Sequence, residues 1–239
     1  MFATMPETKP DATALTGPRE DLAHLLSLTV HELRTPTSVV AGYLKMLRSG
    51  RHGALPADVQ HIVEAADRSC GRVLELVAEI GDLCHLVDGR ARFARTEVIF
   101  GTLVDETIAA CAAAEDRDVR RTGDTAPGGV VLADRQRLGQ VVDTMLTAIL
   151  REVPADAPVL ARLAARSEGF TLIVGDGRAD LDAFLAPARR GHLEQWRGGL
   201  GLRLPIAERV VALEGGTLWS PAGADEPSLI GLDLPRHRS

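Results

Sequence analysis

The segment HELRTP at residues 31–36 lies within the first of two long stretches whose apolar residues recur every three or four positions. The same spacing continues on both sides of this segment, from Leu22 to Leu47, and is typical of an amphipathic helix. Because Pro36 has no backbone N–H to donate, we expect the helix to bend there. The segment therefore places a histidine, a carboxylate and a hydroxyl on a helix that also has an apolar face.

A second stretch with helical spacing runs from Val59 to Val87, and the glycine-containing residues 49–53 separate it from the first. Glycines at this place are typical of a helix end. Two amphipathic helices joined by a short loop predict an antiparallel hairpin. Since two helices alone leave part of the apolar stripe uncovered, we expect a second copy to complete a four-helix bundle across a two-fold axis. The chain is therefore predicted to be a homodimer.

His31, Glu32 and Thr35 form a set suited to phosphoryl transfer. A single histidine on a helix is more often an ordinary surface residue, and only its neighbours favour a catalytic role. An imidazole nitrogen accepts a phosphoryl group when it is neutral and the other nitrogen is held by an acceptor. Glu32 is the adjacent carboxylate that can bond to the ring or take its proton. Thr35 lies one helical turn along the same face, where its hydroxyl can position a water for hydrolysis.

The composition is that of an ordinary soluble protein. The 239 residues include 27 Lys and Arg against 33 Asp and Glu, a net charge of −6, and 45% are hydrophobic. This balance excludes a disordered chain and does not favour nucleic-acid binding. No run approaches the roughly 18 apolar residues of a membrane span, and the N-terminus lacks a signal-peptide pattern. Cys70, Cys84 and Cys111 have no metal-ligand spacing, which predicts reduced thiols in a cytoplasmic protein.

After about residue 90 the pattern mixes strands with helices without strict alternation, which predicts an α+β sandwich. The expected helices are Leu103–Ala114, Arg135–Val153 and Gly201–Glu214, and Asp116–Val131 is expected to be polar and turn-rich. The expected strands are Glu97–Phe100, Val159–Ala165 and Phe170–Val174, with a closing hairpin of Gly216–Ser220 and Ser228–Leu234.

HELRTP and its flanks, LLSLTV at residues 25–30 and TSVVAGYL at residues 37–44, together resemble the dimerisation and phosphoacceptor hairpin of bacterial sensor histidine kinases. The resemblance implies His31 as the phosphorylated residue, Glu32 as the catalytic carboxylate and Thr35 as the residue that supports phosphatase activity. It also implies that an ATP-binding domain of histidine-kinase type, an α/β sandwich, follows the hairpin.

The second half resembles that ATP-binding domain unevenly, and its last signature is the best kept. RGGLGL at residues 197–202 resembles the family's second glycine box, which implies Gly198, Gly199 and Gly201 beside the phosphates. Glycines allow backbone N–H groups to approach phosphates at a helix N-terminus. In the segment before it, Phe184 resembles the family's aromatic lid residue. Arg189 and Arg190 are candidates for phosphate contact, although such a pair in a loop is more commonly solvated.

The middle signature, Asp-x-Gly-x-Gly after a strand, is altered to GDGRA at residues 175–179. In the register that keeps the spacing, Gly175 replaces the aspartate that accepts the adenine amino hydrogen, and Gly177 is retained. Asp176 substitutes for that aspartate only if the chain shifts by one residue. A plain Asp-Gly turn is the other interpretation.

The first signature, Asn-x-x-x-Asn-Ala on a helix, is also altered, because Asp143 and Thr147 stand at the two asparagine positions. The second asparagine normally holds Mg²⁺ between the phosphates. Carboxylate and hydroxyl oxygens are possible Mg²⁺ ligands, although neither reproduces the amide. Arg151, four residues beyond Thr147, is a further candidate for nucleotide binding.

The predicted organisation is a disordered leader at residues 1–19, a phosphoacceptor domain at 20–90 and a degenerate ATP-binding domain at 95–236. We predict a two-component signalling protein of the histidine kinase family, phosphorylated on His31, that passes the phosphate to an aspartate of a response-regulator receiver domain. ATP and Mg²⁺ are its cofactors if it is a kinase. The alternative is a phosphotransferase or scaffold that does not use ATP and relays phosphate between receiver domains. An upstream sensor protein is a further expected partner, because the leader is too short to be a sensor domain.

Overall fold

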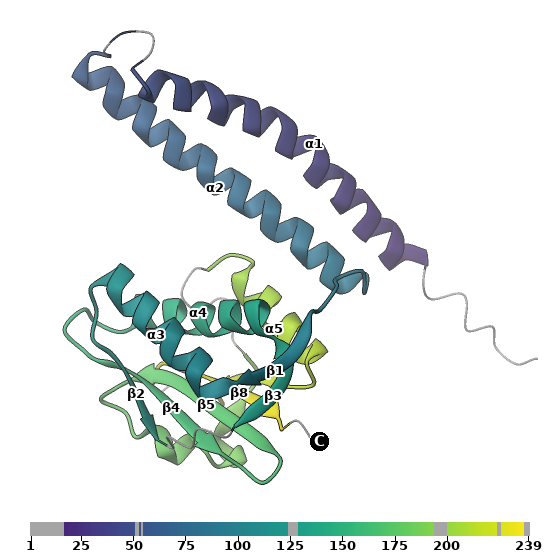
Figure 1. Cartoon of the computed structure of the whole chain (residues 1–239), viewed down its shortest axis with the longest axis vertical. Helices are drawn as coiled ribbons and strands as arrows, with labels where there is room; N and C mark the ends of the chain where they lie inside the picture. The colour runs from purple at the N-terminus through teal and green to yellow at the C-terminus, as the bar shows by residue number, and fades with distance from the viewer. Residues whose placement is uncertain are drawn as a thin grey trace, which may run out of the picture. The chain divides into compact units, whose positions relative to one another are not determined.

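The computed structural model of the chain describes residues 17–50, 53, 55–123, 129–193, 200–223 and 226–236. The chain divides into two compact units, Met1–Arg90 and Ala91–Ser239. Figure 1 shows a helical hairpin in the first unit and a mixed α/β domain in the second, so the predicted α+β class is confirmed. Residues 1–16 of the predicted leader lie outside the described residues, and no described helix has the length and hydropathy needed to cross a membrane.

The first unit is a pair of helices, α1 (Gly17–Arg48) and α2 (Ala57–Val87). On α2 a single row of buried side chains recurs every seven residues: Val63, Cys70, Val77 and Cys84. A seven-residue repeat keeps one seam of a helix against its partner. The thiol of Cys70 donates to the carbonyl oxygen of Thr37 on α1 at 3.4 Å. The predicted hairpin is therefore present, and α1 continues through Pro36 as one helix.

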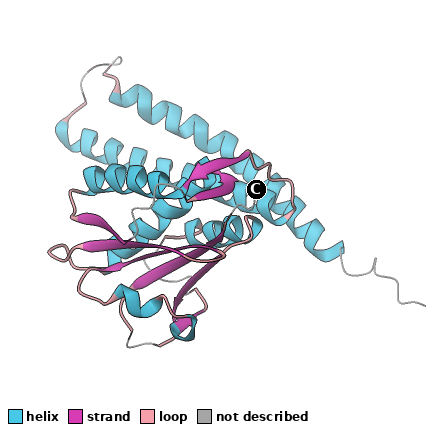
Figure 2. Cartoon of the chain, turned by 60° about the horizontal axis from the view of Figure 1, so that its bottom comes forward, coloured by secondary structure: helices cyan, strands magenta, loops and turns pink. Residues whose placement is uncertain are grey.

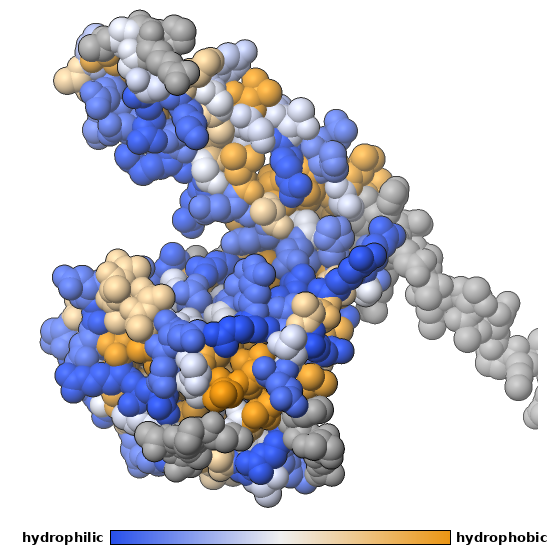
Figure 3. All heavy atoms as spheres, in the orientation of Figure 1, coloured by the Kyte–Doolittle hydropathy of each residue, from blue (hydrophilic) through white to orange (hydrophobic). Residues whose placement is uncertain are grey.

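Much of the apolar surface of the hairpin is uncovered within one chain, as Figure 3 shows by the hydrophobic side chains among polar ones on these helices. The large apolar side chains exposed on the two helices are Leu25, Leu26, Leu28, Leu33, Val39, Val40, Tyr43, Met46, Leu47, Val59, Ile62, Val73, Leu76 and Val87. So many exposed apolar residues on one helical pair are typical of a surface that another protein covers.

The second unit contains a six-stranded sheet in the order β2-β4-β5-β8-β7-β6 and a separate antiparallel pair, β1 (Arg95–Ile99) with β3 (Val130–Asp134). The pair β2 and β4 is parallel, and the other neighbours are antiparallel. The strands of the large sheet are β2 (Val119–Gly123), β4 (Val159–Ala165), β5 (Gly169–Asp176), β6 (Arg190–Gly191), β7 (Thr217–Pro221) and β8 (Leu229–Pro235).

Both faces of this sheet are covered, as Figure 2 shows. One face carries the three long helices α3 (Phe100–Glu115), α4 (Arg135–Glu152) and α5 (Arg203–Leu213), and the other carries the short 3₁₀ helices η2 (Leu181–Phe184) and η3 (Pro187–Arg189). Successive residues of a strand point to opposite faces. On the side of the 3₁₀ helices, Ile173, Leu181, Phe184, Trp219 and Leu229 form a buried cluster.

The helices and most strands lie where the sequence predicts them, but the expected turn-rich segment Asp116–Val131 contains β2 and the start of β3. In β2 only Val119 is buried, and two arginines follow it. A short edge strand of this kind has no alternation of apolar and polar residues, so the sequence carries no signal for it. The predicted helix at Arg135–Val153 is α4, where Asp134 caps the N-terminus by accepting from the backbone N–H of Gln136 and of Arg137, both at 3.1 Å.

The three cysteines are free and buried, and their thiols are predicted to be unreactive in the folded protein. Burial first, and then Asp143 and Glu115 nearby, raises the pKa of Cys111 to about 11. Burial also raises the pKa of Cys84. Because the thiolate is the reactive form, about one molecule in a thousand is reactive at Cys111 at pH 8.

We expect alkylation of Cys111 by iodoacetamide to accelerate roughly tenfold per pH unit up to that pKa. Rapid labelling of Cys111 at pH 8 without denaturant, followed by peptide mass spectrometry, would contradict this.

Candidate functional site

His31 lies on the solvent side of α1. Val30, the residue before it, is only 7% exposed and packs toward α2, whereas His31, Glu32 and Thr35 are all exposed. Each residue of a helix turns by about 100° relative to the one before it. Burial of Val30 therefore orients the next side chain outward. The structure places the three predicted residues on one exposed stretch of helix, with His31 and Thr35 one turn apart.

The hydroxyl of Thr35 differs from those of the two nearby threonines on α1. Thr29 donates to the carbonyl oxygen of Leu25 at 2.8 Å, and Thr37 donates to that of Leu33 at 2.7 Å. Within the described part of the chain, Thr35 has no such bond, and no hydrogen bond joins Glu32 to the imidazole of His31. The hydroxyl of Thr35 is thus open to a ligand or water next to His31, and Glu32 is a neighbouring carboxylate rather than a bonded partner.

The first signature of the second unit forms a row on α4, because Asp143, Thr147 and Arg151 are spaced by four residues. Asp143 and Thr147 are half-buried and Arg151 is exposed. The guanidinium of Arg203, the first residue of α5, donates its Nη2 to the Oδ2 of Asp143 at 2.5 Å. No motif in the sequence points to Arg203, although this residue directly follows the glycine box. This ion pair joins the helix of the first signature to the helix that follows the last one.

The middle signature ends β5 and lines a pocket of about 490 Å³. Asp176 is half-buried there, and its Oδ1 accepts from the backbone N–H of Arg178 at 2.9 Å. The backbone N–H of Gly177 donates to the carbonyl oxygen of Pro158 at 2.8 Å. Phe184 and Arg189 also line this pocket, with the Arg189 guanidinium 4.3 Å from the centroid of the Phe184 ring.

Gly175 is packed too tightly to carry a side chain. A Cβ atom there would lie 2.7 Å from the Cβ of Leu229 and 3.0 Å from a methyl carbon of Leu181. Both neighbours belong to the buried cluster beneath the 3₁₀ helices. The carboxylate at this strand end is that of Asp176, and residue 175 has no room for a second one.

The last signature is described only in part. Gly198 and Gly199 lie outside the described residues. Gly201 is exposed and has a φ of +60°, a left-handed conformation that favours glycine. On either side of it Leu200 and Leu204 are buried, which fixes the start of α5 against the rest of the unit.

The sequence of residues 21–84 matches the His Kinase A (phospho-acceptor) domain, and His31 and all of HELRTP fall inside this match. Histidine protein kinase DivJ of Caulobacter vibrioides is 25% identical over 233 residues, which cover 94% of this chain and 38% of the relative. The domain match and this relative support the two-component sensor histidine kinase family for this chain. Sensor protein FixL of Bradyrhizobium diazoefficiens is 22% identical over 219 residues, which cover 90% of this chain and 43% of FixL. The chain thus spans less than half the length of these two histidine kinase relatives.

Solved structures support the same fold. Full-length ShkA, crystallised in complex with AMPPNP, superposes with a TM-score of 0.68 at 21% identity, covering 91% of this chain and 46% of ShkA. The histidine kinase AdeS of Acinetobacter baumannii superposes with a TM-score of 0.54 at 20% identity, covering 87% of this chain and 98% of AdeS. A helical hairpin followed by a mixed α/β domain is therefore an architecture that this chain has in common with histidine kinases.

Histidine kinases in general use ATP and Mg²⁺, and this chain's α4 residues do not fit that metal. Mg²⁺ requires near-octahedral oxygen ligands and binds through carboxylates that are free to reach it. The Oδ2 of Asp143 already accepts from Arg203, whose positive charge would repel a second cation at the same carboxylate. Within the described residues there is no group of three or more His, Cys, Asp or Glu side chains placed to hold a metal ion.

Restoring the family's aspartate at residue 175 is expected to destabilise the second unit. Gly175→Asp forces a charged side chain against Leu229 and Leu181, which we expect to lower the free energy of unfolding by about 3 kcal/mol or more, because overpacking and burial of an unpaired charge add together. Urea unfolding followed by circular dichroism measures the loss. Gly101→Asp, in the same unit, is the matched control, because a new Cβ there would meet only a methyl carbon of Leu163, at 3.6 Å. Equal stability of the two variants would show that residue 175 has room for the carboxylate.

Proposed function

We propose that His31 is a phosphoacceptor and that the chain passes its phosphoryl group to an aspartate of a response-regulator receiver domain. The observation that supports this most directly is the exposure of His31 beside a hydroxyl without an intrahelical bond, inside the matched phospho-acceptor domain. An exposed imidazole on a rigid helix is accessible both to a phosphoryl donor and to the surface of a partner domain.

The chemistry needs few groups. An imidazole nitrogen of His31 attacks the phosphorus of the donor, an N–P bond forms, and the bond from phosphorus to the donor oxygen breaks. The ring proton passes to Glu32 or to water, which leaves a phosphoramidate. A carboxylate oxygen of the receiver aspartate then attacks the same phosphorus, the N–P bond breaks, and the imidazole regains a proton. The hairpin supplies the nucleophile and its orientation for both steps.

A second copy of the chain is the proposed partner of the exposed apolar side chains on α1 and α2. Leaving a large side chain such as Leu33 or Ile62 in water forgoes roughly 1.5–3 kcal/mol of burial per residue. When two hairpins pack their exposed apolar side chains against each other, they form a four-helix bundle, the common arrangement for paired helical hairpins. The buried row on α2 stays inside each hairpin, so dimerisation leaves the packing around Val30 and Cys70 unchanged.

The phosphoryl donor is proposed from the relatives. They are named kinases, and ShkA was crystallised with AMPPNP, which supports ATP as the donor and does not favour the alternative of a phosphotransferase that never uses ATP. Asp176 and the pocket beside it are the proposed contact for the nucleotide base, because a carboxylate at a strand end accepts a hydrogen from an amino group. The histidine kinase ThkA, solved in complex with the response regulator protein TrrA, superposes with a TM-score of 0.57 at 15% identity, covering 92% of this chain and 64% of ThkA. That complex supports a receiver domain as the acceptor.

The proposal predicts that His31→Ala abolishes acid-labile phosphorylation of the chain. The chain would be incubated with γ-labelled ATP and Mg²⁺ and, separately, with receiver domains phosphorylated by acetyl phosphate, and position 31 would then be examined by mass spectrometry. We expect label on the unaltered chain in at least one of the two conditions, and none on the variant, because the nucleophile is gone. His61→Ala, which removes an exposed histidine from α2, is expected to retain the label. Absence of phosphate at His31 under both conditions would refute the proposal.

Thr35→Ala is predicted to slow hydrolysis of the phosphorylated imidazole by about threefold to tenfold, because it removes a hydroxyl that can orient water one turn from His31. His31 is first loaded with phosphoramidate, the reagent is removed, and the remaining phosphate is followed by mass spectrometry. Thr29→Ala is the control, since the hydroxyl of Thr29 is bonded to the helix backbone. A rate for Thr35→Ala equal to that of the control would remove Thr35 from the mechanism.

A further inference from the structure

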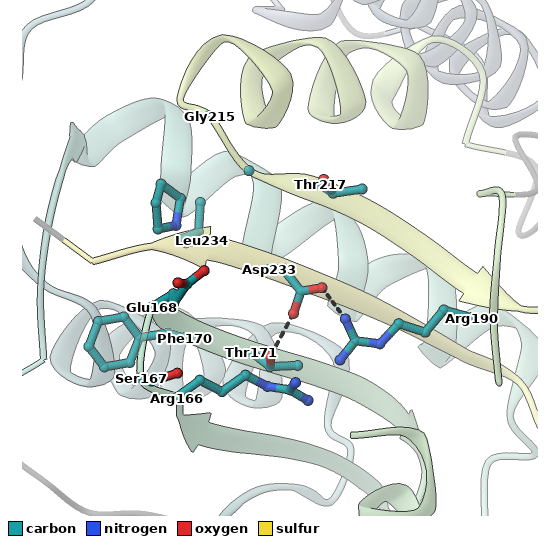
Figure 4. Close-up of a pocket in the computed structure, with 13 residues that line it drawn as sticks. Arg166, Ser167, Glu168, Phe170, Thr171, Arg190, Gly215, Thr217, Asp233 and Leu234 are labelled. Carbon is teal, nitrogen blue, oxygen red and sulfur yellow. Dashed lines mark hydrogen bonds and ion pairs between the residues drawn. The ribbon is translucent and has the colours of Figure 1, made fainter. Parts of the chain in front are cut away.

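A pocket of about 400 Å³ lies on the second unit, against β5, β7 and β8. Figure 4 shows the side chains of Arg166 and Arg190 directed into it, with Thr171 and Asp233 beside them on neighbouring strands. Its residues are distinct from His31, from the row on α4 and from the pocket at Asp176. The proposed function uses none of them.

The two arginines of this pocket lie side by side. Arg190 donates its Nη2 to the carbonyl oxygen of Leu185 at 3.0 Å, and the Nη2 of Arg166 donates to the same oxygen. Two guanidinium groups that share one acceptor are close enough to repel each other in a partly buried site. The segment that carries Leu185 therefore brings two positive charges to the same end of the pocket.

Two carboxylates line the pocket, but only that of Asp233 pairs with these charges in the described part of the chain, and its oxygens are already occupied. Asp233 forms an ion pair with Arg190 and accepts from the hydroxyl of Thr171 at 2.5 Å and from the Nε1 of Trp219 at 3.1 Å. Among the residues that the structure describes, no carboxylate forms an ion pair with Arg166. The carboxylate of Glu168 lies at the other end of the pocket, away from the guanidinium groups (Figure 4).

The guanidinium groups of Arg166 and Arg190 lie in a partly desolvated site. The side chain of Arg190 is 14% exposed. Burial lowers the pKa of Arg190, Asp233 opposes that change, and Arg166 adds to the lowering. Guanidinium groups do not lose their proton in proteins, so the repulsion remains as a cost to the folded state. An anion placed between the two groups would remove that cost.

We propose that this pocket binds a phosphate dianion, either free or as a small phosphate monoester, between Arg166 and Arg190. Guanidinium groups match the oxygens of phosphate with pairs of parallel hydrogen bonds. The hydroxyl-bearing residues Ser167 and Thr217 also line the pocket and supply further donors. Its volume lies within the usual range for small-molecule sites. The site is independent of phosphoryl transfer at His31.

The test measures phosphate binding to the full chain by ³¹P line broadening and by thermal unfolding, at constant ionic strength set with chloride. We expect inorganic phosphate to raise the unfolding temperature, because a ligand that binds only the folded state stabilises it. Arg166→Gln is expected to weaken binding at least tenfold. Arg120→Gln removes an exposed arginine of β2 that pairs with Asp118, outside this pocket, and is expected to bind phosphate as the unaltered chain does. Phenyl phosphate in place of inorganic phosphate shows whether a monoester binds more tightly.

A second measurement on Arg166→Gln tests the repulsion between the two arginines. Without phosphate the variant is expected to unfold at the same or a higher temperature than the unaltered chain, because one of two repelling charges is gone. If Arg166 were only a structural contact to Leu185, the variant would unfold earlier at every phosphate concentration and its phosphate affinity would be unchanged. That result, or the absence of line broadening at millimolar phosphate, would overturn the proposal. His31→Ala is expected to bind phosphate normally, so this test and that of the proposed function fail separately.

Discussion

The packing of α2 against α1 is the constraint from which the exposure of the acceptor histidine follows. The buried row of Val63, Cys70, Val77 and Cys84 fixes which side of α2 meets α1, and Val30 is the buried residue of α1 next to His31. Once Val30 is inside, helix geometry turns His31 toward solvent. A polar imidazole between two helices would lose its hydration and its access to a donor. The reactivity of the hairpin thus depends on apolar contacts made by the neighbouring residue.

The large sheet of the second unit is buried on both faces. In β5, Leu172 and Val174 point to one face and Ile173 to the other, and all three are fully buried. The strand therefore anchors the long helices on one side and the 3₁₀ segment on the other. This double coverage explains why Gly175 has no room for a side chain. It also brings Leu185 and Arg190 over the strands that carry Thr171 and Asp233.

The ion pair between Asp143 and Arg203 affects whether α4 can bind a metal ion. An aspartate at residue 143 would leave a half-buried carboxylate without a counter-charge, and Arg203 at the start of α5 supplies one. The two residues are 60 positions apart in the chain. Exposed ion pairs of this kind contribute little to stability, roughly 0–1 kcal/mol. Their larger effect here is chemical, because the guanidinium of Arg203 places a positive charge beside the carboxylate that a metal ion would otherwise use.

Local sequence determined the hairpin, the candidate histidine and most elements of the second unit, because helical periodicity in residues such as Val59 to Val87 and the motif HELRTP are short-range signals. It did not reveal β2, whose pairing with β4 comes from a distant strand. Tertiary structure alone decided that Leu181 and Leu229 leave no room for a side chain at residue 175, that Arg203 neutralises Asp143, and that Arg166 and Arg190 meet at Leu185. Each of these results joins residues from separate segments of the chain. Spacing along one segment contains no information about which side chains the fold brings together across such distances.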